Sequence, residues 1–111
     1  MTQLKEYKHS DTPMTDDTEW TGAVPAGYEL EKIVFVNSTA NAATIDLGTT
    51  SGNSDVFKNQ VIGASGITTI VINKTFSMLA RQTLYLNDDD AGSDFNSASL
   101  TAILLLRRVM I

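Results

Sequence analysis

The chain has 111 residues and a formal net charge of −5, and it contains no cysteine and one histidine. A chain of this length forms one domain around one core, and the lack of cysteine excludes disulfides, thiolate catalysis and cysteine-bound zinc. The acidic balance without a basic cluster argues against nucleic acid or an anionic membrane as partners. The N-terminal residues lack the apolar stretch of a signal peptide, so we expect synthesis in the cytosol without a secretory signal.

Short β-branched or aromatic runs alternate along the chain with Gly, Asn, Asp and Ser, and helical periodicity is nearly absent. In chain order, we expect strands at 4–8, 19–24, 28–37, 43–47, 55–62, 67–73, 79–86 and 97–111. The first of these could also be an extended arm. In the strand at 28–37, one face is expected to carry Leu30, Val34 and Val36, and the other Glu29, Glu31, Ile33 and Phe35.

Seven or eight strands without helical crossovers predict an all-β fold. The expected architecture is a single antiparallel β-sandwich, jelly-roll-like, in one domain. Residues 1–26 are expected to form an N-terminal arm or the first strands, and residues 27–111 the sandwich core. The sequence does not fix the strand order.

The last expected strand is apolar on both faces through its middle, although a sandwich strand needs only one apolar face. The second face therefore needs a cover, which could be a neighbouring subunit or residues 4–7 of the same chain folded back. We predict an interface between subunits that includes Ile103, Leu104, Leu105, Leu106, Arg107 and Arg108. The arginines would need acidic partners there, and Asp16 and Asp17 of a neighbouring subunit could supply them.

Two sites for small ligands are conceivable. Asp88, Asp90 and Asp94 lie in an acidic loop with the oxygen ligands that calcium prefers, although a solvated loop is the commoner role of such residues. Trp20 and Tyr85 could stack on sugar rings, although core packing is the commoner fate of a lone tryptophan.

Catalytic chemistry finds little support in the residue types present. His9 is the single histidine, which makes a zinc site or a catalytic triad improbable. Glu29 and Glu31 are two residues apart in sequence, a spacing that is ordinary for glutamates on a solvent-facing strand and does not indicate a catalytic pair. We therefore predict no catalytic residue, no resident metal and no cofactor.

Four stretches carry a family resemblance: Gly27–Asn37, Ala43–Thr49, Gln82–Leu86 and Asn96–Arg108. Their layout resembles small β-sandwich modules of bacteriophage and prophage virion proteins, of the head-fibre, decoration or tail-appendage type. The resemblance covers most of the chain after Gly27. It implies a non-enzymatic structural subunit, commonly a trimer, that is displayed on a particle beside other virion proteins.

The predicted function is therefore a structural or assembly role in a virion, exerted through oligomerisation and surface display. The alternative is a carbohydrate- or receptor-binding module whose partner is a host-surface glycan. An enzyme is not expected.

Overall fold

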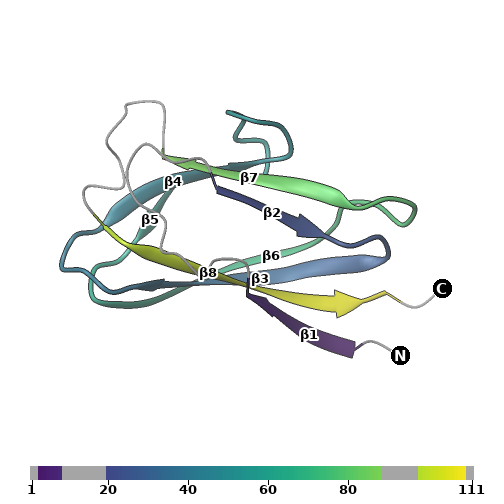
Figure 1. The fold of residues 1–111 in the computed structure, drawn as a ribbon, viewed down its shortest axis with the longest axis horizontal. Coiled ribbons are helices and arrows are strands. Elements are labelled where there is room, and N and C mark those ends of the chain that lie inside the picture. The colour runs from purple at the N-terminus through teal and green to yellow at the C-terminus, as the bar shows by residue number, and fades with distance from the viewer. Residues whose placement is uncertain (1–2, 9–19, 89–97, 110–111) are drawn as a thin grey trace.

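The computed structural model describes residues 3–8, 20–88 and 98–109, which form strands joined by turns and loops (Figure 1). The strands are β1 Gln3–Lys8, β2 Trp20–Val24, β3 Tyr28–Asn37, β4 Ala43–Gly48, β5 Phe57–Ile62, β6 Gly66–Thr75, β7 Gln82–Asp88 and β8 Leu100–Arg108. None of the described residues forms a helix long and apolar enough to cross a membrane. The predicted all-β class is confirmed.

The strands form two antiparallel sheets in the order of a jelly roll (Figure 1). Sheet A has the order β1-β8-β3-β6, and sheet B has the order β2-β7-β4-β5. Within them β1 pairs with β8, β2 with β7, β3 with β6, and β4 with β5. The chain is therefore one long hairpin, with its tip between β4 and β5, folded over on itself. Eight-stranded double-sheet jelly rolls have this architecture, and the predicted sandwich is confirmed.

The core lies between the two sheets and is mainly aliphatic. The fully buried side chains of β8 are Leu100, Ala102, Leu104 and Leu106, and those facing them from sheet B include Ile45, Leu47, Leu84 and Leu86. Burying one large aliphatic side chain contributes about 1.5–3 kcal/mol. This layer is therefore the main source of stability.

The alternation of inward and outward side chains along β3 is interrupted by one extra residue. The register of β3 against β8 shifts after Leu30, where Glu31 is the extra residue of a β-bulge. Leu30 before the bulge and Phe35 after it are both fully buried. The expectation that Val34 and Val36 share a face with Leu30 is therefore wrong, because a one-residue insertion exchanges the two faces of a strand.

Two strands begin three residues later than the sequence indicates. The strand expected from Leu79 begins at Gln82, because Ser77 Oγ accepts hydrogen bonds from the backbone N–H groups of Leu79 (3.1 Å) and Ala80 (3.0 Å). Such bonds offer the backbone an alternative to a strand ladder. The last strand begins at Leu100 rather than at residue 97.

The segment at residues 3–8 is an edge strand. Leu4 of β1 is paired with Arg107 of β8, and Tyr7 is paired with Leu104. The segment therefore lies beside β8 in the same sheet and does not cover its face. The alternative in which residues 4–7 fold back over the last strand is wrong, and β8 is a central strand between β1 and β3.

Candidate assembly surface

Strand β8 presents alternate side chains to the core and to the outside of sheet A. Leu104 and Leu106 are fully buried between the sheets, whereas Ile103 and Leu105 point outward and are half-buried. The interface prediction is wrong for Leu104 and Leu106, because side chains enclosed in the core cannot contact another chain. For Ile103 and Leu105 it stays a prediction.

The outward surface of β8 continues across β3 and β6. Three rows of paired residues cross the sheet: Thr101, Val36 and Ile67; Ile103, Val34 and Thr69; and Leu105, Lys32 and Val71. Directly opposite residues on neighbouring strands share a face and touch. The nine residues therefore form one surface, which we call the outer face, and six of them are apolar.

The outer face is most exposed at the edge strand β6. Ile67 is 71% exposed and Val71 is 65% exposed. Scattered apolar side chains are ordinary on a soluble protein, but a contiguous apolar patch marks an interaction surface. Neither residue is among those predicted from the sequence. The sequence signal that could have found them is the one used for the last strand, namely apolar residues on both faces. In β6, Ile70 and Ile72 face the core, and Ile67 and Val71 face outward.

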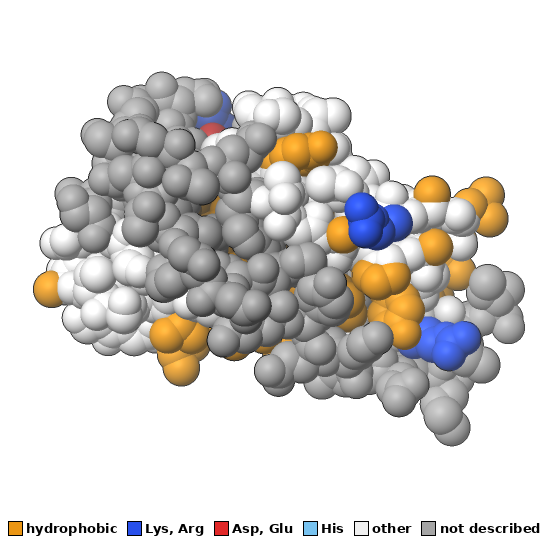
Figure 2. All heavy atoms as spheres, viewed as in Figure 1, with side chains coloured by type: hydrophobic (Ala, Val, Ile, Leu, Met, Phe, Trp, Pro, Cys, Tyr) orange, Lys and Arg blue, Asp and Glu red, His pale blue; other side chains and the backbone are white. Residues whose placement is uncertain are grey.

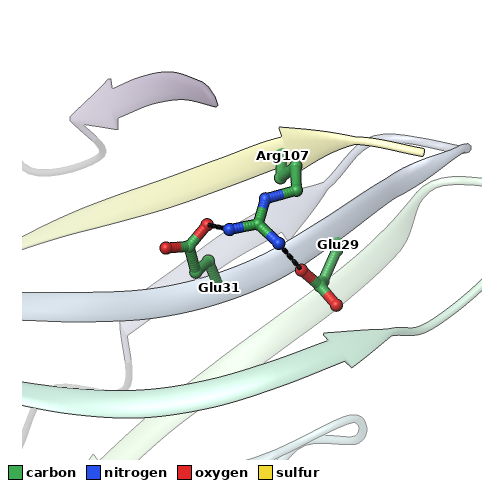
Figure 3. Close-up of polar contacts among 3 residues, drawn as sticks. All are labelled: Glu29, Glu31 and Arg107. Carbon is green, nitrogen blue, oxygen red and sulfur yellow. Dashed lines mark ion pairs between the residues drawn. The ribbon is translucent and has the colours of Figure 1, made fainter. Parts of the chain in front are cut away.

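An ion-pair cluster borders the outer face near the end of β8 (Figure 3). Arg107 Nη1 lies 3.4 Å from Glu29 Oε1, and Arg107 Nη2 lies 2.5 Å from Glu31 Oε2. Glu29 is paired with Arg107 in the register, and the bulge at Glu31 brings the second carboxylate to the same guanidinium. Both contacting oxygens are enclosed and make no hydrogen bond of standard geometry. The charge of Arg107 therefore compensates their loss of water.

This cluster changes the expected partners of the last strand's arginines. Arg107 takes its carboxylates from its own chain, so the expectation that it depends on a neighbouring subunit is wrong. Asp16 and Asp17 lie outside the described residues. Arg108, the next residue, is exposed.

We expect Arg107→Gln to lower the free energy of unfolding by about 2 kcal/mol, because two neighbouring carboxylates would lose the cation between them. The cost is below that of a fully buried pair, since the arginine side chain is 39% exposed and water screens the charges. Urea-induced unfolding measures the loss. Arg108→Gln, an exposed change on the same strand, is the matched control, and equal stability of the two variants would contradict the expectation.

The loop between β4 and β5 is closed at its base by a carboxylate. Asp55 accepts hydrogen bonds from Thr49 Oγ1 (2.6 Å) and from the backbone N–H of Thr49 (2.8 Å). The bond from the Thr49 hydroxyl has the larger effect and the bond from the Thr49 backbone N–H the next, and both hold the pKa of Asp55 below its usual value. Gln82 Nε2 also donates to the carbonyl oxygen of Thr49 (3.3 Å). The loop is therefore attached to β7 as well as to itself.

The two aromatic residues proposed for sugar stacking do not share a face. Trp20 is paired with Leu86, and Tyr85 is paired with Thr21. Opposite residues share a face and successive residues alternate, so the positions of Trp20 and Tyr85 lie on different faces of sheet B. The two positions are therefore not on one face, and glycan binding by either residue stays a prediction.

The calcium candidates fall mostly outside the described residues. Asp88 is the last residue of β7, and Asp90 and Asp94 lie in the undescribed segment, as His9 does in another. Within residues 3–8, 20–88 and 98–109, no group of three or more His, Cys, Asp or Glu residues could hold a metal ion. The calcium prediction is therefore untested.

A separate exposed apolar side chain lies in the loop between β6 and β7. Leu79 is 94% exposed. A hydrogen bond from the backbone N–H of Gly27 to the carbonyl oxygen of Ser77 (3.0 Å) ties this loop to the turn between β2 and β3. Figure 2 shows apolar and basic side chains together at the end of the molecule where the termini lie. The loop thus presents Leu79 to solvent from a fixed base.

No protein-family model matches the chain, and no curated protein matches its sequence. Among solved structures, a chain of the cyanophage Pam1 capsid asymmetric unit is similar, with 11% identity and a TM-score of 0.51 over 99% of this chain and 84% of that chain. What they share is the fold. A chain of infectious bursal disease virus, Gx strain, aligns with 13% identity and a TM-score of 0.41 over 96% of this chain and 32% of that chain. The β-sandwich described here is thus also found, over nearly its whole length, in a viral capsid.

Proposed function

We propose that the chain is a non-enzymatic structural subunit of a virion that associates with copies of itself and with other virion proteins. The observation that carries the proposal is the outer face, where apolar rows cross a sheet whose other side already forms the core. Such a surface is typical of an interaction site. The fold shared with the cyanophage capsid chain supports a place in a particle.

The charges favour a second copy of the chain as the occupant of the outer face. With a net charge of −5, two copies repel each other on average. Lys32 on the outer face and Arg107 at its border balance Glu29 and Glu31, however, so the outer face and this border together carry no net charge. Copies can therefore meet there without local repulsion. The proposed roles are those of a head-fibre, decoration or tail-appendage subunit, and a trimer is the number that the resemblance favours.

Light scattering tests the self-association. The wild-type protein is expected to have a native mass of at least twice the 12.0 kDa of one chain. Leu105→Asp is expected to shift the native mass toward that of one chain while the fold is kept. Val61→Asp is the matched control, because Val61 is exposed and lies on the outside of sheet B. A wild-type monomer at every concentration, or an equal effect of both variants, would contradict the proposed surface.

Mass spectrometry of purified particles tests the location. If the proposal holds, particles released by the strain that encodes the chain contain it in many copies. Intact particles without the chain would overturn the virion assignment, whatever the native mass of the isolated protein.

A further inference from the structure

We propose that β6 pairs with β6 of a second copy in antiparallel orientation, so that sheet A continues across two chains. This inference rests on the proposed self-association and adds a second contact to it, one of strand edges rather than of sheet faces. The feature that carries it is the edge of sheet A at Gly66–Ile72.

Strand β6 is an edge strand, and β3 is its one strand neighbour within the described residues. An edge strand presents backbone N–H and C=O groups that can pair with another chain, and natural proteins usually block such edges with charges, prolines or irregular backbone. The edge strand β5 follows this rule, since it contains Lys58 and has Asn59 in the left-handed region with φ of 55°. The edge strand β1 contains Lys5, Glu6 and Lys8.

The edge at β6 lacks these protections over seven residues. Gly66–Ile72 contains no charged residue and no proline, and its last six residues are Ile, Thr, Thr, Ile, Val and Ile, all β-branched. Such residues favour the extended conformation. The first irregularity is Asn73, with φ of 52°. The free edge therefore ends where the backbone leaves the regular strand.

The exposed side chains select one register for the pairing. Directly opposite residues in a sheet share a face. In a pairing related by a two-fold axis perpendicular to the sheet, one residue of β6 must therefore lie opposite its own copy, and the axis passes between the two. An axis at Thr69 places Ile67 opposite Val71 of the second copy, and Val71 opposite its Ile67. An axis one residue earlier or later pairs each of these side chains with a threonine or with a residue beyond the regular segment.

This register covers the most exposed part of the outer face. Ile67 and Val71, which are 71% and 65% exposed in the single chain, would form two apolar cross-strand pairs on either side of a Thr69–Thr69 pair. Both kinds of pair are favourable in antiparallel sheets. The apolar rows would then continue from one copy into the next. A seven-residue edge is about 23 Å long, so the contact is smaller than a standard interface and forms mainly at the high local concentration of an assembly.

Disulfide trapping tests the register, because the chain has no cysteine of its own. In Thr69→Cys the two thiols would meet across the axis, since opposite residues in antiparallel strands are about 4.5–5.5 Å apart between Cα atoms and disulfides span this distance. Under mild oxidation this variant is expected to form cross-linked dimer about tenfold faster than Leu79→Cys, because pairing raises the effective thiol concentration. Leu79 is the control for an exposed position outside the edge.

A second substitution separates pairing from random collision. Adding Val71→Lys to Thr69→Cys places a charge on the edge and is expected to reduce cross-linking to the rate of Leu79→Cys, with the far-ultraviolet circular dichroism unchanged. A mixture of Ile67→Cys and Val71→Cys chains should cross-link faster than either alone. Cross-linking of Thr69→Cys at the control rate, or a rate insensitive to Val71→Lys, overturns the inference.

The outcomes also distinguish this inference from the proposed function. If Thr69→Cys fails to cross-link faster than the control while Leu105→Asp still lowers the native mass, edge pairing is wrong and the outer face stands. If Thr69→Cys cross-links and Leu105→Asp changes nothing, the assembly surface is wrong and edge pairing stands. Two-fold pairing also requires an even number of chains, such as a hexamer of two trimers, so a trimer with no larger species contradicts it.

Discussion

Leu104→Asp is expected to leave the chain unfolded at 25 °C. Leu104 is fully buried between the two sheets and lies on a strand with neighbours on both sides. Truncating such a leucine to alanine costs about 2–5 kcal/mol, and a carboxylate buried there without a partner adds several kcal/mol more. Together these costs are comparable to the whole stability of a domain, about 5–15 kcal/mol. The cooperative unfolding transition should therefore disappear.

The adjacent change, Leu105→Asp, is the matched control for this prediction. Leu105 lies on the outer face and is half-buried, so an aspartate there keeps contact with water, and the cost to the single chain is expected to be about 1 kcal/mol. Near-ultraviolet circular dichroism and urea unfolding of both variants measure the difference. A folded Leu104→Asp protein, or two variants with equal stability, would mean that the faces of β8 are assigned the wrong way round.

The strand content could be predicted from local sequence because each strand has β-branched or aromatic residues between turn formers. The turns at Pro25–Gly27 and Ser38–Ala42 fall where these residues indicate, and β3 has the predicted bounds. The start of β7 was missed because Ser77, a residue with no strong signal, bonds to the N–H groups of Leu79 and Ala80. Side-chain bonds of this kind depend on the turn that the chain adopts.

The faces of the strands were harder to predict than the strands. Alternation places Leu30 and Val34 on one face of β3, and the bulge at Glu31 separates them. Nothing in the residues around Glu31 marks an extra position. In the folded chain, the bulge lets both Glu29 and Glu31 contact Arg107, which lies on a strand distant in the sequence.

The candidate site was half predicted. The double-sided apolar character of the last strand correctly indicated a second apolar surface, and Ile103 and Leu105 lie on it. Its extent could not be found from one strand, because Val34, Val36 and Ile67 join it only through the strand order β8-β3-β6. Local pattern shows that a strand has two apolar faces. Which side becomes core depends on the whole jelly roll.

Asn37→Asp is expected to lower the free energy of unfolding by about 3 kcal/mol, because two part-buried hydrogen bonds to carbonyl groups would be lost and a carboxylate oxygen would face these carbonyl oxygens instead. Asn37 is a buried polar residue at the end of β3, 2% exposed. Its Nδ2 donates to the carbonyl oxygens of Asn41 (2.7 Å) and Gly63 (3.1 Å). Its Oδ1 accepts from the backbone N–H of Thr39 (3.0 Å) and from Thr39 Oγ1 (2.8 Å).

The amide is satisfied on both sides, so an isosteric change to aspartate removes two of its four bonds. The carboxylate still accepts from Thr39 through one oxygen, but its other oxygen replaces Nδ2 and faces the carbonyl oxygens of Asn41 and Gly63, with which it cannot form a hydrogen bond. These carbonyls belong to the turn between β3 and β4 and the turn between β5 and β6, which are also joined by the bond from Ser65 N–H to the carbonyl oxygen of Thr39 (2.7 Å). The loss therefore falls on a junction that connects the two sheets at one end of the sandwich.

The same exchange in a solvated loop provides the control. Asn53 lies in the exposed loop between β4 and β5, where its Nδ2 donates to Thr50 Oγ1 (3.2 Å), and Asn53→Asp is expected to change stability by about 0.5 kcal/mol or less. Thr39→Val removes the hydroxyl bond to Asn37 and the two longer hydroxyl bonds with the backbone of Asn41, but it leaves the amide donors of Asn37 in place, and it should cost about 1 kcal/mol. Urea unfolding of the three variants should therefore rank Asn37→Asp as the most destabilised and Asn53→Asp as the least. A loss for Asn37→Asp no larger than that for Asn53→Asp would show that the two turns hold together without the amide.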